Sequence, residues 1–493
     1  MNIKVISRNV GYALLVSALF MFLSILVSVA NGNDSALAAL MISFTITFTV
    51  GIFPFIFVRK SAAITLKDGY MIIALSWLLS FIFGMLPYAL WGGPFTIINA
   101  WFESVSGFTT TGSTILDNVE ALPNSLLFWR SSTHFIGGLG VVVFLLLIIP
   151  SSSQMRLRLT TLELSSLSKR EYRSGANKTV YIFTYVYFGL TAASFLLYVM
   201  AGMSPFDAIN HAMSVVATGG FSTRNLSIGA YNSVSVDLIT MLFMLLSSIH
   251  FGMVFVTVAT RSLKPFRNEI FKFYIWSLVV TSVIVAMSLK VHGIEKSWGD
   301  ALLSGSFHIL SFASTTGFSI ADNSAWPVLP SAMLVFVGIW CGMAGSTSGG
   351  VKSDRALLLC KEVKYQLRMA LHPASVNEIR VNGRVVRQDD VAPHILYIAL
   401  YFMVVIISVA SCLIFNPDND HALTATLTSL SNVGLSVGDL GSIYSFNAEP
   451  SSAKFIYTLD MFLGRVEIYP ILAVVMMIFS RRNKCHGRRR FFL

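Results

Sequence analysis

Long apolar stretches alternate with short amphipathic segments along the whole chain. Four times, a stretch long enough to cross a bilayer is followed by a segment too short to cross it, a loop rich in Ser, Thr and Gly, and a second long stretch. We interpret each short segment as a re-entrant helix that enters and leaves on one side. The expected span pairs are 69–91 with 125–149, 179–201 with 234–259, 273–291 with 326–351, and 392–415 with 455–480, and the re-entrant helices are 97–108, 205–216, 301–313 and 421–430.

Two further apolar segments precede these units. They cover about 10–30 and 37–58, a polar turn joins them, and no loop rich in Ser, Thr and Gly follows either one. The pattern therefore predicts an all-α membrane protein of ten spans and four half-spans. Its expected parts are an N-terminal two-helix hairpin at 1–60, helix-loop-helix repeats at 61–155, 156–262 and 263–355, and a fourth repeat with a cytoplasmic tail at 356–493.

The four loops share a pattern around one glycine. The position six residues before this glycine is always Ser or Thr, and so is the position two residues after it. Such a recurrence indicates one structural unit used four times. Because irregular backbone at membrane depth must be buried in protein or line a pathway, the four loops should meet. The glycines are Gly112, Gly220, Gly317 and Gly434; the earlier positions are Ser106, Ser214, Ser311 and Thr428; the later ones are Thr114, Ser222, Ser319 and Ser436.

Loops of this kind suit a dehydrated monovalent cation. Inward-facing carbonyl oxygens can replace its hydration shell, and glycine reaches the backbone angles that align them. The C-terminal end of each re-entrant helix adds partial negative charge near the pathway. The alternative is that small residues merely relieve crowding between packed membrane helices. That interpretation suffices for one copy, whereas four copies in register favour a pore.

Composition and charge narrow the class of protein. With 55% hydrophobic and 12% charged residues, the chain does not resemble a soluble domain. The net charge of +11 could suggest nucleic acid, but all except six of the 35 Lys and Arg residues lie on one side of the predicted spans. This distribution follows the positive-inside rule, excludes a nucleic-acid partner, and predicts a multi-pass protein of the lipid bilayer with cytoplasmic N- and C-termini.

Together these features resemble the membrane subunit of the Trk/Ktr/HKT potassium-uptake superfamily, in particular the bacterial TrkH type with its extra N-terminal hairpin. The resemblance implies four pseudo-symmetric pore repeats, similar to those of potassium channels, around one pore in each subunit of a homodimer in the bacterial inner membrane. It also implies potassium as the transported ligand, no organic cofactor in this chain, and a cytoplasmic ring of TrkA-type nucleotide-binding regulatory subunits.

The resemblance assigns the loops to a selectivity filter. In the family each loop keeps one glycine of the potassium-channel signature, and the carbonyls of the residues just before it coordinate the ion. A serine at the first glycine marks sodium-preferring relatives, so Gly112 favours potassium; the fourth loop departs most from the others. The implied metal-binding residues are Thr110, Thr111, Gly112, Thr218, Gly219, Gly220, Thr315, Thr316, Gly317, Asn432, Val433 and Gly434.

A glycine-rich run interrupts the second span of the third repeat just before Lys352. By spacing alone it is either a break inside the membrane or a glycine-rich helix end at the inner surface. The family has an intramembrane loop at this position, which blocks the pore below the filter and moves during gating. The resemblance therefore implies a gate at 342–350 that includes Gly342, Gly345, Ser346, Ser348, Gly349 and Gly350.

Arg465 lies near the middle of the last predicted span. A guanidinium there costs about 2.5 to 3.5 kcal/mol on insertion scales, so we expect it to face the pore cavity. The alternative is an ion pair with Asp460 or Glu467, although Glu467, two positions away on a helix, does not share its face. By resemblance the arginine forms a barrier below the filter together with the gate.

Other polar residues have simpler interpretations. Glu103, His211 and His308 each lie nine residues before a filter glycine, and we expect polar packing there, while Ala425 breaks the pattern. Arg130, near the outer end of a span, is expected to extend its charge to the interface.

The leading hypothesis is a gated potassium-uptake protein and not an enzyme, because no nucleophile, base or metal-ligand set converges. A sodium- or proton-coupled secondary cation symporter is the alternative. Such transporters usually have inverted repeats, whereas the four copies here share one orientation. No GxGxxG segment follows a strand, so the regulatory nucleotide must bind elsewhere.

Overall fold

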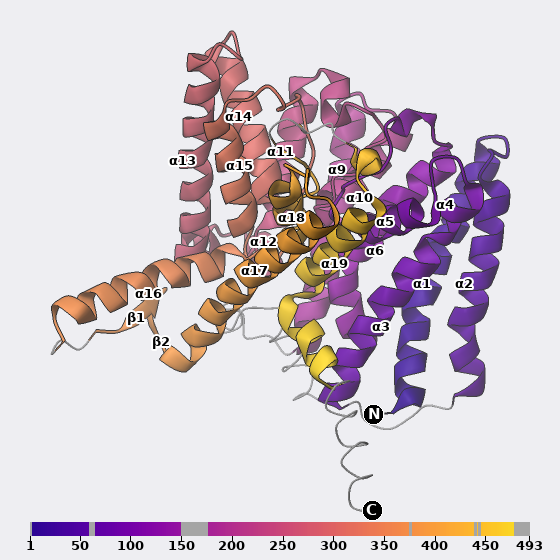
Figure 1. Ribbon diagram of the computed structural model, residues 1–493, viewed down its shortest axis with the longest axis horizontal. Coiled ribbons are helices and arrows are strands. Elements are labelled where there is room, and N and C mark those ends of the chain that lie inside the picture. Colours follow the sequence, from indigo (N-terminus) through magenta and orange to yellow (C-terminus); the bar gives the residue numbers. More distant parts are fainter. Residues whose placement is uncertain are drawn as a thin grey trace, which may run out of the picture.

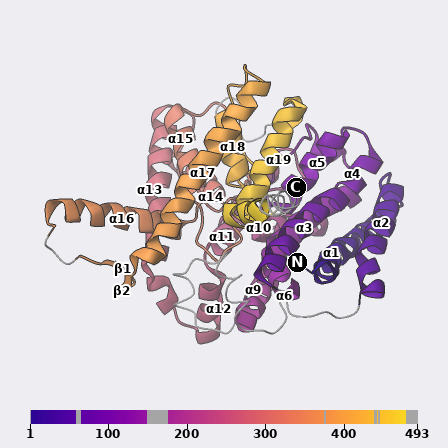
Figure 2. The ribbon, with the colours of Figure 1, turned by 60° about the horizontal axis from the view of Figure 1, so that its bottom comes forward.

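The computed structural model describes residues 2–58, 65–148, 176–373, 377–437, 441 and 445–477, and this part of the chain is a helical bundle (Figure 1). Long helices stand side by side around a central group of short ones. In Figure 2 the short helices α10 (Pro205–Ala217), α14 (Trp298–Ala313) and α18 (Ala422–Leu430) lie near the centre. The mainly helical architecture that the hydrophobic pattern predicts is therefore present.

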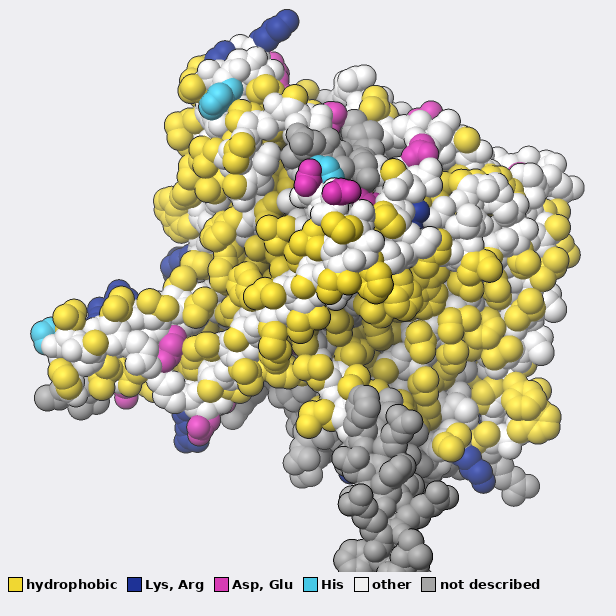
Figure 3. Space-filling model, in the orientation of Figure 1, with side chains coloured by type: hydrophobic (Ala, Val, Ile, Leu, Met, Phe, Trp, Pro, Cys, Tyr) yellow, Lys and Arg dark blue, Asp and Glu magenta, His cyan; other side chains and the backbone are white. Residues whose placement is uncertain are grey.

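Six single helices of the described residues are long and apolar enough to cross a membrane, and one bent pair also qualifies. Their outer faces carry exposed Leu, Ile, Val and Phe side chains, and Figure 3 shows a broad hydrophobic band across the visible face. Exposed apolar surface of this extent is what contact with lipid tails requires. The six segments are Ile3–Ala30 (α1), Leu37–Phe57 (α2), Lys67–Trp91 (α3, Leu66–Gly84, with α4, Leu86–Trp91), Tyr181–Met200 (within α9, Ala176–Met200), Glu269–Val291 (α13) and Gln388–Phe415 (α17).

Three of the expected spans are interrupted. The segment predicted at 234–259 is two helices, α11 (Val234–Ser248) and α12 (Phe251–Thr260), bent by 104°. The segment predicted at 455–480 is also divided into two helices. Helix α19 (Ser451–Val466) ends just before Glu467, whose φ is +65°, and a separate helix, Ile468–Met477, follows. The span predicted at 326–351 is the short α15 (Val328–Trp340) followed by a loop. Helix α6 (Asn124–Ile148) keeps its expected length.

The short helices begin where local capping signals stand. Thr96 accepts a hydrogen bond from the Asn99 amide at the start of α5 (Ile97–Phe108), and Ser204 accepts one from Asp207 at the start of α10. Their residues face inward, since nearly every side chain in the last two turns of α5 and α10 is buried. These helices therefore point their C-terminal ends at one another inside the protein.

One helix leaves the bundle. Helix α16 (Ser353–Leu371) projects sideways together with a two-stranded antiparallel hairpin, β1 (Ile379–Val381) and β2 (Arg384–Val386) (Figure 1). The strands turn at Asn382 and Gly383, which both have positive φ, as a two-residue hairpin loop requires. This hairpin is a small departure from the all-α prediction, and it lies between the predicted spans 326–351 and 392–415.

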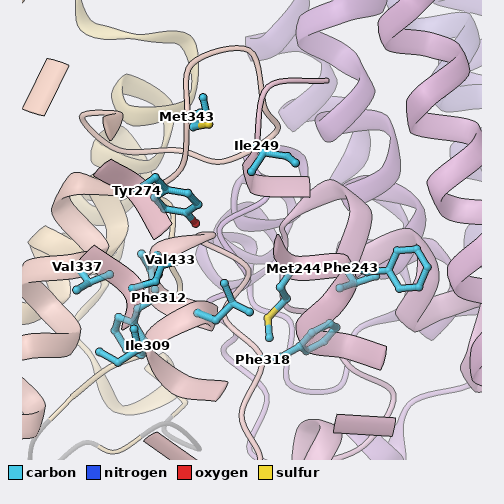
Figure 4. Packing of buried hydrophobic residues seen from close by; sticks show 14 of the residues in the cluster. Phe243, Met244, Ile249, Tyr274, Ile309, Phe312, Phe318, Val337, Met343 and Val433 are labelled. Atoms are coloured by element: carbon cyan, nitrogen blue, oxygen red, sulfur yellow. The ribbon is translucent and has the colours of Figure 1, made fainter. Parts of the chain in front are cut away.

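The remaining described elements are short 3₁₀ turns: η1 (Val119–Ala121), η2 (Ser227–Tyr231), η3 (Lys264–Arg267) and η5 (Phe446–Ala448). Buried hydrophobic residues from several repeats form the core beneath the central loops. Figure 4 shows Phe312 and Val433 close to Val337, with Met343 and Ile249 above them in that view. This cluster ties the glycine-rich loop after α15 to the bend between α11 and α12.

Candidate functional site

The four short helices α5, α10, α14 and α18 end in the same backbone arrangement. In each, the residue before the glycine donates its amide to a carbonyl five residues back, and the preceding residue donates to a carbonyl three residues back. These two bonds define a Schellman C-cap. The five-back pairs, all at 2.9 Å, are Thr111 to Ser106, Gly219 to Ser214, Thr316 to Ser311, and Val433 to Thr428.

The residue two positions before the glycine has a left-handed conformation in all four loops. Three of these four residues are threonine, for which a positive φ is unfavourable. The glycine two positions later also has positive φ, while the residue between them does not. Alternation of this kind rotates successive peptide planes, so the carbonyls do not alternate between two sides as in a β-strand. The φ values are +51°, +55°, +56° and +57° at Thr110, Thr218, Thr315 and Asn432, and +87°, +86°, +75° and +79° at Gly112, Gly220, Gly317 and Gly434.

The four glycines close the loops into a ring. A Cβ atom added at each glycine would overlap a carbonyl of the next loop, so no other residue fits there without displacement. The contacts run from the first loop to the second, third and fourth, and back to the first. The distances from such a Cβ are 2.0 Å from Gly112 to the Gly219 oxygen, 2.3 Å from Gly220 to Thr316, 2.3 Å from Gly317 to Val433, and 1.9 Å from Gly434 to Thr111.

The structure thus brings all twelve predicted filter residues together from four segments far apart in the chain. The groups that meet the glycines at the ring are backbone carbonyl oxygens. No group of three or more His, Cys, Asp or Glu side chains that could hold a metal ion occurs among the described residues. The donor set is that of a monovalent cation that exchanges its water shell for neutral oxygens, and differs from a transition-metal centre.

Polar side chains behind the ring hold three of the loops to their own helices. The residue nine positions before the glycine contacts the hydroxyl two positions after it: Thr114 donates to Glu103 at 3.0 Å, His211 lies 2.9 Å from Ser222, and His308 lies 3.1 Å from Ser319. The fourth loop has Ala425 at this position, and the buried Ser436 hydroxyl has no hydrogen-bond partner. The expected polar packing is therefore present in three loops and missing in the fourth.

Arg130 does not extend to the membrane surface as expected. It is 2% exposed, and its Nε lies 2.8 Å from Glu103. It also donates to the Ser222 carbonyl of the second loop at 3.2 Å and lies over the Phe221 ring, 4.0 Å from its centroid. The prediction was wrong because the buried carboxylate of Glu103, 27 residues earlier, competes for the guanidinium.

A second ion pair lies at the N-terminal end of α10. Arg224 donates to Asp207 at 3.0 Å, and Thr223 donates to the same carboxylate at 2.6 Å. Burial acts to raise the pKa of Asp207, but the hydrogen bonds from Thr223 and Arg224 outweigh it, so this pKa lies below its usual range. This carboxylate is therefore ionised at neutral pH.

The glycine-rich run 342–350 forms a loop that packs against the second and third loop segments. The Gly349 amide donates to the Thr315 hydroxyl at 2.8 Å, and the Thr347 hydroxyl donates to the Val216 carbonyl at 3.0 Å. The Met343 amide donates to the Ser248 carbonyl at 2.8 Å, at the bend between α11 and α12. The loop is buried except for the half-buried Ser346, and all six predicted loop residues of the gate lie in it.

Arg465 binds this loop. Its guanidinium donates to the Thr347 carbonyl at 2.6 Å and to the Gly137 carbonyl of α6 at 3.0 Å, and the side chain is 7% exposed. The two suggested carboxylates have other partners: Glu467 pairs with Arg355 at 2.9 Å, and Asp460 accepts from Ser408 at 2.6 Å.

Sequence reasoning missed several residues of this region. The bend at Ile249 and His250 receives the loop, and a Cβ at Gly345 would lie 2.4 Å from the His250 ring. Asn432 was predicted for its backbone carbonyl, but the contacts of its side-chain amide with the first loop and with α19 were not. A weak signal existed at the bend, because Ser247, Ser248 and His250 interrupt an apolar stretch that was otherwise expected to be a single span.

Comparison with known proteins gives consistent results over nearly the whole length. A family described as TrkH, cation transport protein, matches residues 36–275 and 269–484. The Trk system potassium uptake protein TrkH of Halomonas elongata is 31% identical, with 98% of this chain and 100% of that protein covered. The protein of the same name from Escherichia coli K12 is 30% identical, with 98% and 100% covered. The crystal structure of the potassium transporter TrkH from Vibrio parahaemolyticus has a TM-score of 0.86 and 28% identity, covering 96% of this chain and 98% of that one.

Proposed function

Since the chain belongs to the TrkH family of cation transport proteins, we propose that it takes up potassium ions across the bacterial inner membrane through the ring of four loops. It is a transport protein and not an enzyme. The relatives at about this level of identity are named potassium uptake proteins, which supports potassium as the transported ion. No organic cofactor or nucleic acid is part of the proposal.

The observation that carries this proposal is the closed ring of glycine-to-carbonyl contacts. A potassium ion that enters must exchange its water shell for protein oxygens, and four copies of the same loop offer such oxygens at the same depth. We assign coordination to the carbonyls of the two residues before each glycine. These are Thr110, Thr111, Thr218, Gly219, Thr315, Thr316, Asn432 and Val433.

We further propose that the loop 342–350 and Arg465 form the gate. The loop packs against the inner side of the third filter loop through Gly349, and Arg465 holds it at Thr347. A guanidinium below the ring also adds positive charge to the path of a cation, which raises the electrostatic barrier to its passage. Release of the Thr347 contact would open the path and allow ion flux.

The proposal includes the assembly implied by the family. We assign a homodimer, cytoplasmic N- and C-termini, and control of the gate by TrkA-type nucleotide-binding regulatory subunits on the cytoplasmic side. The excess of Lys and Arg on the predicted inner loops supports this orientation. We also propose the four pore repeats and the N-terminal hairpin with the boundaries that the sequence pattern predicts.

The competing function is a sodium- or proton-coupled cation symporter. The observation in its favour is Asp460, a carboxylate 1% exposed whose Oδ2 atom has no hydrogen-bond partner. A carboxylate in this environment could bind a proton or a second cation. Rubidium flux that follows only the electrochemical gradient of rubidium separates uncoupled conduction from coupled transport, because a symporter also responds to the gradient of the coupled ion.

Substitution of the first filter glycine tests the function. In liposomes that contain the purified chain, Gly112→Ser should lower the preference for potassium or rubidium over sodium by roughly tenfold, about 1.4 kcal/mol of discrimination. The physical reason is that a Cβ at this position would lie 2.0 Å from the Gly219 carbonyl and displace it.

The matched control is Gly189→Ser in α9, because a Cβ at Gly189 has no neighbour within 4 Å. This variant should keep the cation preference of the parent protein. An unchanged preference in Gly112→Ser, with the protein still folded, would show that the ring is not the selectivity filter.

A further inference from the structure

The side chain of Asn432 links three parts of the proposed conduction path. Its Nδ2 atom donates to the Thr111 hydroxyl of the first filter loop at 3.0 Å and to the Met461 carbonyl of α19 at 2.9 Å. Because a carbonyl only accepts hydrogen bonds, the contact with Met461 fixes which amide atom is nitrogen. Both N–H groups of the Asn432 amide therefore donate hydrogen bonds. The residue is fully buried, at 0% exposure.

The other amide atom, Oδ1, lies between two glycines of the gate region. A Cβ at Gly349 would be 2.9 Å from this oxygen and 2.3 Å from the Ser431 carbonyl. A Cβ at Gly464 would be 2.8 Å from the same oxygen. The gate loop and the turn of α19 that carries Arg465 thus both approach one side chain of the fourth filter loop, and Oδ1 has no hydrogen-bond donor there.

The three counterparts of Asn432 make different contacts. Threonine occupies this position in the other loops: the Thr110 hydroxyl has no hydrogen-bond partner, and the Thr218 hydroxyl donates to the adjacent Ala217 carbonyl. The Thr315 hydroxyl accepts a hydrogen bond from the Gly349 amide at 2.8 Å, which joins the third filter loop to the loop 342–350. Asn432 therefore joins gate and filter in a way that its equivalents do not.

We infer that Asn432 is a positioning residue that couples the gate to the selectivity filter. Its backbone carbonyl belongs to the proposed filter. Its side-chain amide donates to α19 and lies against Gly349, so its position depends on both. When the loop 342–350 moves away, Oδ1 loses its packing against Gly349, and the contacts to Met461 and Thr111 readjust. The position of the gate is thereby transmitted to the first and fourth filter loops.

This inference rests on the proposed function, since it assumes a filter and a gate. It adds that the two are energetically coupled through one side chain. Residues in direct contact or in one hydrogen-bond network show non-additive effects on double substitution, whereas independent sites do not. A double-mutant cycle between Asn432 and Arg465 therefore measures the coupling directly.

The experiment compares four forms of the full chain in liposomes by rubidium uptake: the parent protein, Arg465→Ala, Asn432→Thr and the double variant. Threonine is chosen because it stands at the equivalent position of the other three loops. We expect Arg465→Ala to raise uptake in the parent background. In the Asn432→Thr background the same substitution should have an effect at least about threefold smaller, because the side chain that transmits gate movement is absent.

The matched control is Ser113→Ala. The Ser113 hydroxyl also joins the first and fourth loops, through a hydrogen bond to the Gly434 carbonyl at 3.2 Å, and this contact lies between two filter loops. The effect of Arg465→Ala should be the same with and without Ser113→Ala, since the two sites share no partner. This control separates gate coupling from general loosening of the ring.

The outcomes are distinct. If Arg465→Ala raises uptake equally in the parent and Asn432→Thr backgrounds, the coupling inference is overturned and the proposed gate stands. If Arg465→Ala alone leaves uptake unchanged, the gate proposal fails and the inference with it, while the Gly112 test still decides the filter. Size-exclusion chromatography confirms folding; should Asn432→Thr not fold, Asn432→Asp, which keeps the shape but loses both donors, replaces it in the same cycle.

Discussion

Buried charge near the ring is held by several partners at once. Arg130 contacts Glu103, the Ser222 carbonyl and the Phe221 ring, so one side chain joins the first and second loops. The Glu103 carboxylate in turn accepts from Thr114 and the Ile115 amide, immediately after the first filter glycine. Removal of either charge alone would leave its partner buried and unpaired, which costs far more than the pair contributes.

Arg130→Ala should therefore destabilise the protein by about 3–5 kcal/mol, because it leaves the Glu103 carboxylate without its counter-charge. Thermal unfolding in detergent measures the loss. Removal of both charges, by Arg130→Met together with Glu103→Gln, should recover part of it.

The comparison is Arg224→Ala, which breaks the ion pair with Asp207. Because the Arg224 side chain is 44% exposed and Asp207 keeps the hydrogen bond from Thr223, this change should cost clearly less than Arg130→Ala. Equal losses in Arg130→Ala and Arg224→Ala would contradict the role given to burial.

At the scale of elements, local signals were enough for the re-entrant helices but not for the breaks. Helix α5 covers the predicted residues, and α10 and α14 differ from prediction by a few residues, because caps and loop residues mark their ends. The bend at Ile249 is held by contacts with a distant segment. The Met343 amide donates to the Ser248 carbonyl, and the Phe251 amide donates to the Gly345 carbonyl. Gly252 and the polar residues beside it were only weak local signals of that bend, so the hydrophobic pattern predicted one continuous span.

The seating of the gate loop on this bend gives an element-scale prediction. Gly345 has a φ of +80°, and a Cβ there would lie 2.4 Å from the His250 ring. Gly345→Ala should displace the loop and raise basal rubidium uptake several-fold.

His250→Ala in the same chain removes the steric overlap but not the backbone strain, so it should restore only part of the low basal uptake. Gly189→Ala serves as the control glycine, since its added methyl meets nothing within 4 Å. Basal uptake in Gly345→Ala equal to that of the parent would argue against a blocking role for the loop.

At the scale of the whole molecule, four similar units differ in how each loop is held. The first uses an ion pair, the second and third use His211 and His308, and the fourth uses Asn432 in place of a contact from its own helix. The repeated glycines predicted that the loops would meet. The order and closure of the ring, and the cross-loop contacts of Arg130 and Asn432, could not be predicted, because they join residues far apart in the chain.

Closure of the ring within one chain decides which unit conducts. The contact of Gly434 with the Thr111 carbonyl returns the ring to its first loop, so no second chain is needed to complete it. In a homodimer each chain should therefore conduct through its own ring, and the partner should not alter its selectivity.

When parent and Gly112→Ser chains are mixed before reconstitution, sodium uptake should rise in proportion to the fraction of variant, reaching about half its full value in an equal mixture. A ring shared between two chains would instead need both copies to carry the substitution and would give about a quarter at that point. Sodium uptake measured across a series of mixing ratios, with total protein held constant, distinguishes the straight line from the curve.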